Sequence, residues 1–373
     1  MNAPGLYIHI PFCLRKCPYC DFYSVTALDK LPAFLEALNT EMALYCGAFA
    51  PFDTVYIGGG TPSLLAPQQL ALILGRVREN FPLLPDTEIT LETNPADLDD
   101  ASLAAIRGMG VNRLTIGCQS FDQALLAFLG RRHSAAHAAH AIAAARSAGF
   151  TNIGVDLIYG IPDQGVAQWL DTLRRCLAYQ PEHLSCYQLT VEAGTPLGKS
   201  YRQGAFSLPN EDLALEFFMQ TAEFLEGAGY VHYEVSNFAQ GMAFASRHNQ
   251  KYWDHTPYLG LGPGAHSFAS NRRWWNYRSI DRYLAALGAG ERPVAAAEPL
   301  TGEQLQLEAL YLGLRTKQGI RLQDYALRYH VDLLAQKKDR LSALQTAGLI
   351  TIKDGQLHPT RAGLAVADSL ALL

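Results

Sequence analysis

The sequence predicts an α/β protein, built as a partial (β/α)6 TIM-like barrel followed by a small winged-helix-like C-terminal domain. Three observations support this prediction. Short apolar or β-branched runs alternate with helical stretches at the spacing of βα units, which favours a parallel sheet. About six such units are present, fewer than the eight of a closed barrel, so a partial barrel and an open sheet both fit the pattern. From residue 301 onward this alternation stops.

The predicted strands and helices follow one another along the first half of the chain. The strands lie at 6–10, 54–57, 88–92, 113–117, 152–157 and 184–189. The helix-like segments between them lie at 31–45, 67–80, 100–108, 135–148 and 166–179. In a barrel and in an open parallel sheet alike, chemistry gathers at the C-terminal ends of the strands. We therefore expect the functional residues at those ends.

The C-terminal part begins with a capping box, in which Thr301 and Gln304 start a helix that runs to residue 314. Two further helices at 322–329 and 333–347, a hairpin around Asp354-Gly355 and a last helix from about Arg361 complete a winged-helix-like module. Nine Lys and Arg against seven Asp and Glu over 301–373 give a charge of about +2. Because this excess is small, we favour a packing or lid role over DNA binding.

The composition is that of a globular protein, with 49% hydrophobic and 17% charged residues. The net charge of −5 argues against a protein that binds nucleic acid through its phosphates. The N-terminus lacks a basic segment followed by an apolar one, and no apolar run could span a bilayer, so we expect a cytoplasmic protein. Thiols stay reduced there, which favours a metal site over disulfides for any cysteine cluster.

Such a cluster directly follows the first predicted strand. Cys13, Cys17 and Cys20 are spaced Cys-x3-Cys-x2-Cys, and three thiolates from one loop can hold three corners of a [4Fe–4S] cubane while one iron stays open. Zinc is the competing interpretation, but a structural zinc site wants four ligands, usually in two pairs, and no second pair exists. The other four cysteines are expected to be buried small hydrophobes: Cys46, Cys118, Cys176 and Cys186.

This spacing, with the aromatic Tyr19 before the third cysteine, resembles the signature of the radical S-adenosylmethionine (SAM) superfamily. The resemblance implies that the methionyl group of SAM chelates the open iron and that reduction of the cluster yields a 5′-deoxyadenosyl radical. The run Gly58-Gly59-Gly60-Thr61-Pro62 is similar to the family's glycine-rich segment, which meets the methionyl amino group. Alone, this run would indicate no more than a turn, and it lacks the GxGxxG spacing of a dinucleotide site.

Five further polar residues resemble SAM-binding positions of the family. Glu92 ends the third strand, where a carboxylate can accept both ribose hydroxyls. Gln119 follows the fourth strand, Asp156 lies on the fifth, and Tyr7 lies just before the cysteine loop. Arg131 matches the arginine that pairs with the methionyl carboxylate, a contact that suits a planar guanidinium. Each also has an ordinary structural interpretation, and it is their placement on successive strand ends that favours the functional one.

The whole chain is similar to the oxygen-independent coproporphyrinogen III oxidase group. Two departures put the oxidase reaction in doubt, because Phe22 stands where the oxidase has a further cysteine and the first strand begins almost at once. Both fit the HemW-type haem chaperones, which look like the oxidase but lack its activity. That branch carries an His-Asn-x-x-Tyr-Trp motif implicated in haem binding, and residues 248–253 match it.

Histidine 248 of this motif has two interpretations. Imidazole is a common ligand of haem iron, and the resemblance implies that His248 binds haem. From residue types alone, a histidine hydrogen-bonded within the structure is the better explanation. His255 and His266 lie nearby and could supply a second ligand, but the sequence selects neither. Three more histidines, at 133, 137 and 140, are predicted to share one helix face, which we expect to be solvated rather than metal-binding.

These observations predict a barrel over residues 1–235, a connecting segment with the haem motif over 236–300 and a winged-helix-like domain over 301–373. The resemblance implies a haem chaperone that binds haem, transfers it to acceptor proteins, and carries a [4Fe–4S] cluster and SAM. The alternative is a radical enzyme acting on a porphyrin, by coproporphyrinogen III decarboxylation or haem degradation. Whether the SAM site turns over stays open, as do homodimer formation and transient membrane association. No nucleic-acid partner is expected.

Overall fold

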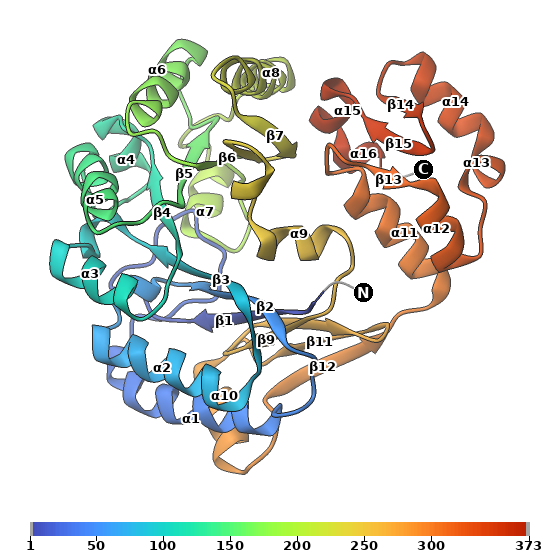
Figure 1. Ribbon diagram of the computed structural model, residues 1–373. Coiled ribbons are helices and arrows are strands. Elements are labelled where there is room, and N and C mark those ends of the chain that lie inside the picture. Colours follow the sequence, from blue (N-terminus) through green and yellow to red (C-terminus); the bar gives the residue numbers. More distant parts are fainter. Residues whose placement is uncertain (1–2, 371–373) are drawn as a thin grey trace.

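Most of the chain is organised around one mixed β-sheet (Figure 1). The computed structural model describes residues 3–370, and within them twelve strands pair in the order β12-β11-β10-β9-β1-β2-β3-β4-β5-β6-β8-β7. The central six are parallel and follow the order of the sequence: β1 (Gly5–Ile10), β2 (Phe52–Gly59), β3 (Leu83–Thr93), β4 (Arg113–Gln119), β5 (Ile153–Tyr159) and β6 (His183–Gln188). All six predicted strands are present, although β3 begins five residues earlier than predicted.

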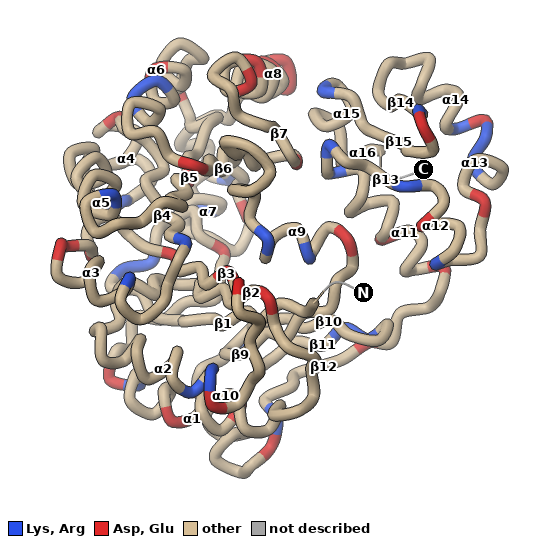
Figure 2. The backbone as a smooth tube through the Cα atoms, viewed as in Figure 1, with Lys and Arg blue, Asp and Glu red and all other residues tan. Residues whose placement is uncertain are grey.

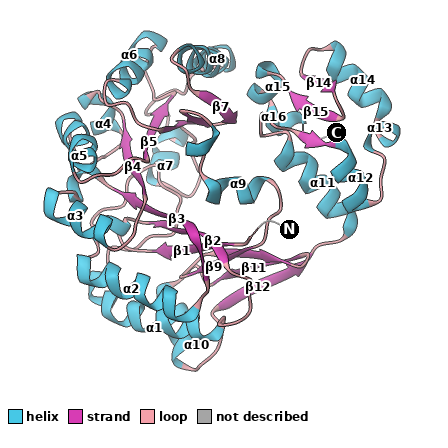
Figure 3. Ribbon diagram, viewed as in Figure 1, coloured by secondary structure: helices cyan, strands magenta, loops and turns pink. Residues whose placement is uncertain are grey.

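Helices connect these strands and cover the outer face of the sheet (Figure 3). The face of the sheet that the helices cover is apolar; in β1, for example, Leu6, Ile8 and Ile10 share that face and are fully buried. In α6, Trp169 is also fully buried and donates its indole N–H to Thr221 Oγ1 at 2.7 Å. The connecting helices are α1 (Leu31–Leu44), α2 (Pro67–Asn80), α3 (Asp100–Gly108), α4 (Gln123–Phe128), α5 (Ala135–Ser147) and α6 (Val166–Leu177).

Strands from later in the chain extend the sheet at both ends. The strand β9 (Tyr258–Leu261) lies parallel to β1 on the side away from β2, and Gly5 pairs with Tyr258. Beyond it, β10, β11 and β12 continue antiparallel, while β8 and β7 extend the β6 side. The elements of this part are α7 (Pro196–Arg202), α8 (Glu211–Gly227), β7 (Val231–Glu234), β8 (Asn237–Ala239), α9 (Arg247–Trp253), β10 (His266–Ala269), β11 (Arg272–Asn276), α10 (Ile280–Gly288) and β12 (Val294–Pro299).

A buried carboxyl group ties the added strands to the first helix. Glu41 of α1 is fully buried and accepts hydrogen bonds from Gly262 N at 2.8 Å, Asn276 Nδ2 at 2.6 Å and the Tyr283 hydroxyl at 2.6 Å. Burial raises the pKa of Glu41 to about 7, although these three bonds favour its charged form. The group therefore joins α1, β11, α10 and the turn after β9 in one polar contact inside the core.

The C-terminal module has its own core and a three-stranded sheet in the order β13-β15-β14. Asp354 and Gly355 have φ values of 51° and 75°, which matches the predicted primed turn between β14 and β15. The single helix predicted over 333–347 is wrong, because Lys337 ends α13 and α14 begins after it. The elements are α11 (Gly302–Gly313), β13 (Ile320–Arg321), α12 (Leu322–Tyr329), α13 (Leu333–Gln336), α14 (Lys338–Thr346), β14 (Ile350–Lys353), β15 (Gln356–Pro359), α15 (Arg361–Ala365) and α16 (Ala367–Leu370).

The module packs beside α8 and β7 (Figure 1). Glu226 of α8 forms ion pairs with Lys317 at 2.8 Å and with Arg361. Backbone hydrogen bonds join Val235 N to Arg315 O and Lys317 N to Tyr233 O, both at 3.0 Å. Figure 2 shows basic and acidic residues interspersed along the backbone of the module. Within residues 3–370, no helix combines the length and the apolar character that a bilayer crossing requires.

Candidate functional site

A cavity of about 1450 Å³ lies at the carboxyl ends of the parallel strands. One part of its wall comes from strand ends and from the loops that follow them, including Tyr7, Tyr19, Cys20, Gly59, Gly60, Thr61, Glu92, Gln119, Arg131 and Asp156. Another part comes from α8, with Leu215 and Phe218, and from the C-terminal module, with Arg315 and residues 364–369. The cavity thus gathers most of the polar residues that the sequence singled out.

The cysteine loop leaves β1 and is closed at its base by backbone hydrogen bonds. Val25 N donates to Pro11 O at 2.7 Å, and Cys13 N donates to Val25 O at 3.0 Å. Cys13, Cys17 and Cys20 are all free thiols. Two cavity residues hydrogen-bond to their sulfurs: Thr61 Oγ1 lies 3.4 Å from Cys13 Sγ, and Arg131 Nη1 lies 3.6 Å from Cys17 Sγ. Both contacts aim a donor at a sulfur that could serve as a ligand of iron.

The three thiols fit a cubane better than a single ion. Over residues 3–370, no three Cys, His, Asp or Glu side chains converge on a point that could hold one metal ion. A structural zinc ion needs four ligands at about 2.0–2.3 Å around one centre. In a [4Fe–4S] cluster each thiolate binds a different iron, so the sulfurs must stand apart. One loop that carries three thiols supplies the donors that three irons of such a cluster would need.

The glycine run is required because the chain passes very close to the start of the cysteine loop. A Cβ atom on Gly60 would lie 2.7 Å from Phe12 O and 2.8 Å from Ile10 O. Gly59 has a φ of 111°, and a Cβ there would lie 2.5 Å from His9 Nδ1. The run therefore lets the end of β2 pack against the residues that lead into Cys13.

Two half-buried carboxyl groups lie in the cavity wall. Glu92 accepts hydrogen bonds from Gly59 N at 2.9 Å and from the Tyr56 hydroxyl at 2.8 Å, which leaves part of its accepting capacity for a ligand. Burial raises the pKa of Glu92 above its ordinary value. Burial also raises the pKa of Asp156 to about 7, and its Oδ1 has no hydrogen-bond partner among the described residues. A polar ligand with hydroxyl or amino groups would satisfy both.

Arg131 and Gln119 complete this polar wall. Arg131 donates to Gly117 O at 2.7 Å and to the Tyr19 hydroxyl at 3.4 Å, while its buried Nε finds no partner in residues 3–370. Gln119 has a φ of 67°, which is unusual for a residue other than glycine, and the register between β4 and β5 shifts beside it. Backbone strain of this kind is common at functional sites, where the surrounding structure holds a side chain in one fixed direction.

Tyr7 closes the cavity next to Glu92. Its hydroxyl lies 3.0 Å from His9 Nδ1, and His9 Nε2 lies 2.8 Å from Tyr23 O. Burial raises the pKa of Tyr7 well above its ordinary value and lowers that of His9 to about 4. Both side chains are therefore neutral near pH 7, and both ring nitrogens of His9 already have partners.

His248 lies behind the cavity wall and does not line it. Its Nδ1 is 2.8 Å from Thr54 Oγ1, its Nε2 is 2.9 Å from the Tyr252 hydroxyl, and the residue is 1% exposed. Burial lowers the pKa of His248 to about 3. Either nitrogen would have to give up its hydrogen bond before it could bind iron, whereas Tyr252, the partner of Nε2, does line the cavity.

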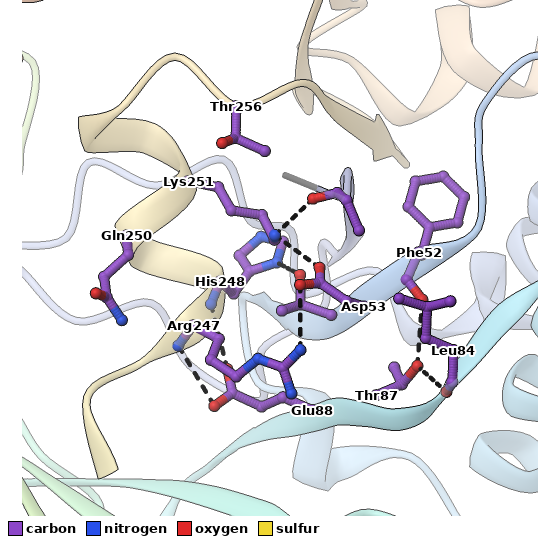
Figure 4. Close-up of polar contacts among 12 residues, drawn as sticks. Phe52, Asp53, Leu84, Thr87, Glu88, Arg247, His248, Gln250, Lys251 and Thr256 are labelled. Atoms are coloured by element: carbon purple, nitrogen blue, oxygen red, sulfur yellow. Dashed lines mark hydrogen bonds and ion pairs between the residues drawn. The ribbon is translucent and has the colours of Figure 1, made fainter. Parts of the chain in front are cut away.

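The neighbours of His248 on α9 anchor that helix to the sheet (Figure 4). Lys251 lies 2.6 Å from Asp53 Oδ1, and Arg247 Nη2 lies 3.1 Å from Asp53 Oδ2. The backbone N–H groups of Arg247 and His248 both donate to Glu88 of β3. This part of the motif therefore fixes the place of α9 against β2 and β3.

Other sequence-based expectations need correction. His133 is not on the helix with His137 and His140; it precedes α5, is buried, and contacts Cys118 O at 2.8 Å. Cys46 is exposed, whereas Cys118, Cys176 and Cys186 are buried as expected.

Sequence reasoning missed several cavity residues. Tyr187 and Gln188 end β6, so the rule that sites form at strand ends could have identified them. Leu215 of α8, and Arg315 and Val366 of the C-terminal module, lie in parts of the chain that the strand pattern does not place near the site, and no motif marks them.

Comparisons with known proteins agree with this geometry. The model of the Radical SAM superfamily matches residues 7–176, and that of the HemN C-terminal domain matches residues 300–366. The chain is 36% identical to the heme chaperone HemW of Mycobacterium tuberculosis, over 98% of this chain and 93% of that protein. It is 39% identical to HemW of Escherichia coli, over 70% of this chain and 69% of that protein.

Among solved structures, coproporphyrinogen III oxidase (HemN) from Escherichia coli superposes with a TM-score of 0.86, covering 99% of this chain and 89% of that chain. The identity is 23%, so this likeness concerns the fold. The extent and identity of the matches to its relatives show that the chain belongs to the HemW family of the radical SAM superfamily.

Proposed function

We propose that this protein is a haem chaperone, which binds haem and passes it to acceptor proteins while it carries a [4Fe–4S] cluster and SAM. Its relatives of this family are named haem chaperones. The observation that carries the proposal is the size and composition of the cavity. At about 1450 Å³ it exceeds the roughly 300–1,000 Å³ of an ordinary small-molecule pocket, so it offers room for a second large ligand besides SAM.

The two ends of the cavity differ in chemistry. The end beside the cysteine loop carries Glu92, Arg131 and Asp156, which suit the charged and hydroxylated parts of SAM. Other parts of the wall offer exposed apolar side chains, namely Phe22, Leu215 and Val366, which are 69%, 47% and 38% exposed. Exposed apolar side chains in a cavity favour an apolar ligand, and a porphyrin ring is one.

We assign the cluster to Cys13, Cys17 and Cys20. Around it we assign SAM contacts to residues whose polar groups face the cavity: Tyr7, Tyr19, Gly59, Gly60, Thr61, Glu92, Gln119, Arg131 and Asp156. Glu92 would accept the ribose hydroxyls, and Arg131 would pair with the methionyl carboxylate. When bound, the cluster and SAM supply one-electron chemistry. The protein works in the cytoplasm in this proposal, since thiols stay reduced there.

The same proposal divides the chain into three parts. Residues 1–235 form a partial (β/α)6 barrel, residues 236–300 form a connecting segment with the haem motif, and residues 301–373 form a winged-helix-like lid. The lid role is supported by Arg315 and by residues 364–369, which line the cavity across from the strand ends.

Haem titration tests the chaperone function directly. The purified full chain should bind haem saturably, with one haem per chain and a shifted Soret band. The haem-loaded protein should then deliver haem to an apo-cytochrome faster than free haem at the same concentration reaches it. A linear, unsaturable titration, or delivery no faster than from free haem, would reject the proposal.

A radical reaction on a porphyrin is the second candidate. The polar end of the cavity favours it, because it retains half-buried Glu92, Asp156 and Arg131 beside the cysteine loop. Anaerobic, reduced protein with a reconstituted cluster should be incubated with SAM and either coproporphyrinogen III or haem. Repeated turnover to protoporphyrinogen or to haem breakdown products would replace the chaperone function with an enzymatic one. Haem binding without porphyrin turnover is the expected result.

A further inference from the structure

A haem site in the cavity needs a side chain that can bind the iron. The chain has eleven histidines, and those that line the cavity are His9 and His266. Both ring nitrogens of His9 are engaged, as are both nitrogens of His248 behind the wall. His255, the other histidine close to the motif, is buried between Tyr329 and Glu308 and does not line the cavity.

His266 differs from all three. It starts β10, is exposed, lines the cavity, and its ring has no hydrogen-bond partner among residues 3–370. The Trp275 ring stacks on it with centroids 5.6 Å apart and an interplanar angle of 23°. The indole therefore limits the directions in which the imidazole can point while both ring nitrogens stay free. Partial burial is the main cause that lowers the pKa of His266, and the positive charges of Arg273 and Arg278 lower it further. The lowered pKa favours the neutral imidazole, which is the form that binds metals.

The surroundings of His266 suit the rest of the haem. Phe22, next to Asp21 in the chain just after the cysteines, is 69% exposed and also lines the cavity, so it offers an apolar face to a porphyrin ring. Arg278 also lines the cavity, and Asp21 O and Asp21 Oδ2 hold one end of its guanidinium beside this loop. A guanidinium there suits the carboxylates of the haem side chains. An imidazole, an exposed aromatic ring and a cation thus converge on one region.

We infer that His266 is the axial ligand of the haem iron, with Phe22 against the porphyrin ring and Arg278 near the haem carboxylates. This inference rests on the proposed haem-binding function and names the site that performs it. His248 becomes a positioning residue, because it holds Tyr252 in the cavity wall through the hydrogen bond between Nε2 and the hydroxyl. The haem then lies on the β9–β10 side of the cavity and leaves the polar strand ends to SAM.

The test compares ferric haem bound to the parent chain, to His266→Ala and to His140→Ala. His140 is an exposed histidine on α5 that does not line the cavity, so its variant controls for loss of a surface imidazole. The readouts are the dissociation constant, the Soret position and the electron paramagnetic resonance spectrum of the ferric iron. Thermal melting without haem checks that each variant folds like the parent.

His266→Ala should weaken binding by at least tenfold and change both spectra, and added free imidazole should restore the spectra of the parent. His140→Ala should match the parent throughout. If His266→Ala keeps the affinity and spectra of the parent, the inference is wrong while the haem-binding function stands. A parent chain that shows no saturable haem band would instead overturn the proposed function, and this inference with it.

Discussion

Replacement of Gly60 by alanine tests how closely the glycine run must approach the cysteine loop. The added Cβ would meet Phe12 O at 2.7 Å, and ordinary van der Waals contact begins at 3.4 Å, so the two backbone segments must separate by about 0.7 Å (3.4 − 2.7). Both contacted atoms are backbone carbonyls, which cannot rotate away as a side chain can. The φ of Gly60 lies outside the left-handed region, so the effect is one of space alone.

Overpacking of this kind costs about 1–3 kcal/mol. We expect Gly60→Ala to lose stability in that range and to displace Cys13, which follows Phe12 directly. The free energy of unfolding in urea measures the first effect, and iron and sulfide bound per chain after anaerobic reconstitution measure the second. Bound iron should fall well below that of the parent.

Gly75→Ala is the matched control. Gly75 lies within α2, and a Cβ there would meet no atom within 4 Å. Alanine should stabilise this helix position by roughly 0.5–1 kcal/mol and leave the iron content unchanged. If Gly60→Ala equals the parent in both stability and iron content, the close approach between β2 and the cysteine loop is not required, and the steric argument fails.

Three further predictions concern buried polar groups. The pKa of Glu41 is about 7 in the folded chain, against 4.5 for an ordinary glutamate. Between these two pH values the folded chain holds a proton that the unfolded chain releases. The free energy of unfolding should therefore fall by up to about 3 kcal/mol as the pH rises from 4.5 to 7. Urea titrations should show a flatter dependence for Glu41→Gln, and an unchanged slope would contradict this. In Arg131→Lys a single ammonium group replaces the guanidinium that reaches Gly117 O and the Tyr19 hydroxyl. SAM should then bind about tenfold more weakly, while the iron content stays equal to that of the parent chain. Equal dissociation constants for SAM would be inconsistent with the role assigned to Arg131. Trp169→Phe leaves Thr221 without its indole donor and should cost about 1–3 kcal/mol in urea unfolding, whereas parental stability would show that the bond contributes little.

The parallel strands and the cysteine loop could be predicted from the sequence because their information is local. A strand with one face against the helices carries apolar residues at every second position, and β1 shows this in Leu6, Ile8 and Ile10, which alternate with the cavity-lining Tyr7 and His9. The cysteine spacing lies within one loop of eight residues, 13–20. Strand-end placement then brings Glu92 and Asp156 to one cavity without any knowledge of side-chain contacts.

The rest depends on contacts between residues far apart in the chain. The environment of His248 is set by Thr54, which lies 194 positions away, and no residue type near His248 reveals that partner. The break at Lys337 arises in the packed module, where Leu333 and Leu341 are both buried in its core on either side of the interruption. Helical periodicity alone would continue one helix through that position.

The place of β9 in the sheet has a consequence for how the protein is made. The strand β1 carries the cysteine loop, and its neighbours are β2, which follows soon after it, and β9, which starts at Tyr258. During synthesis, the ribosome must complete more than two thirds of the chain before β1 can gain its second neighbour. Pairings between distant segments form slowly and leave a strand edge exposed in the meantime. The cysteine loop therefore leaves the ribosome long before the sheet beneath it is complete, and the edge of β1 that β9 covers stays unpaired until then.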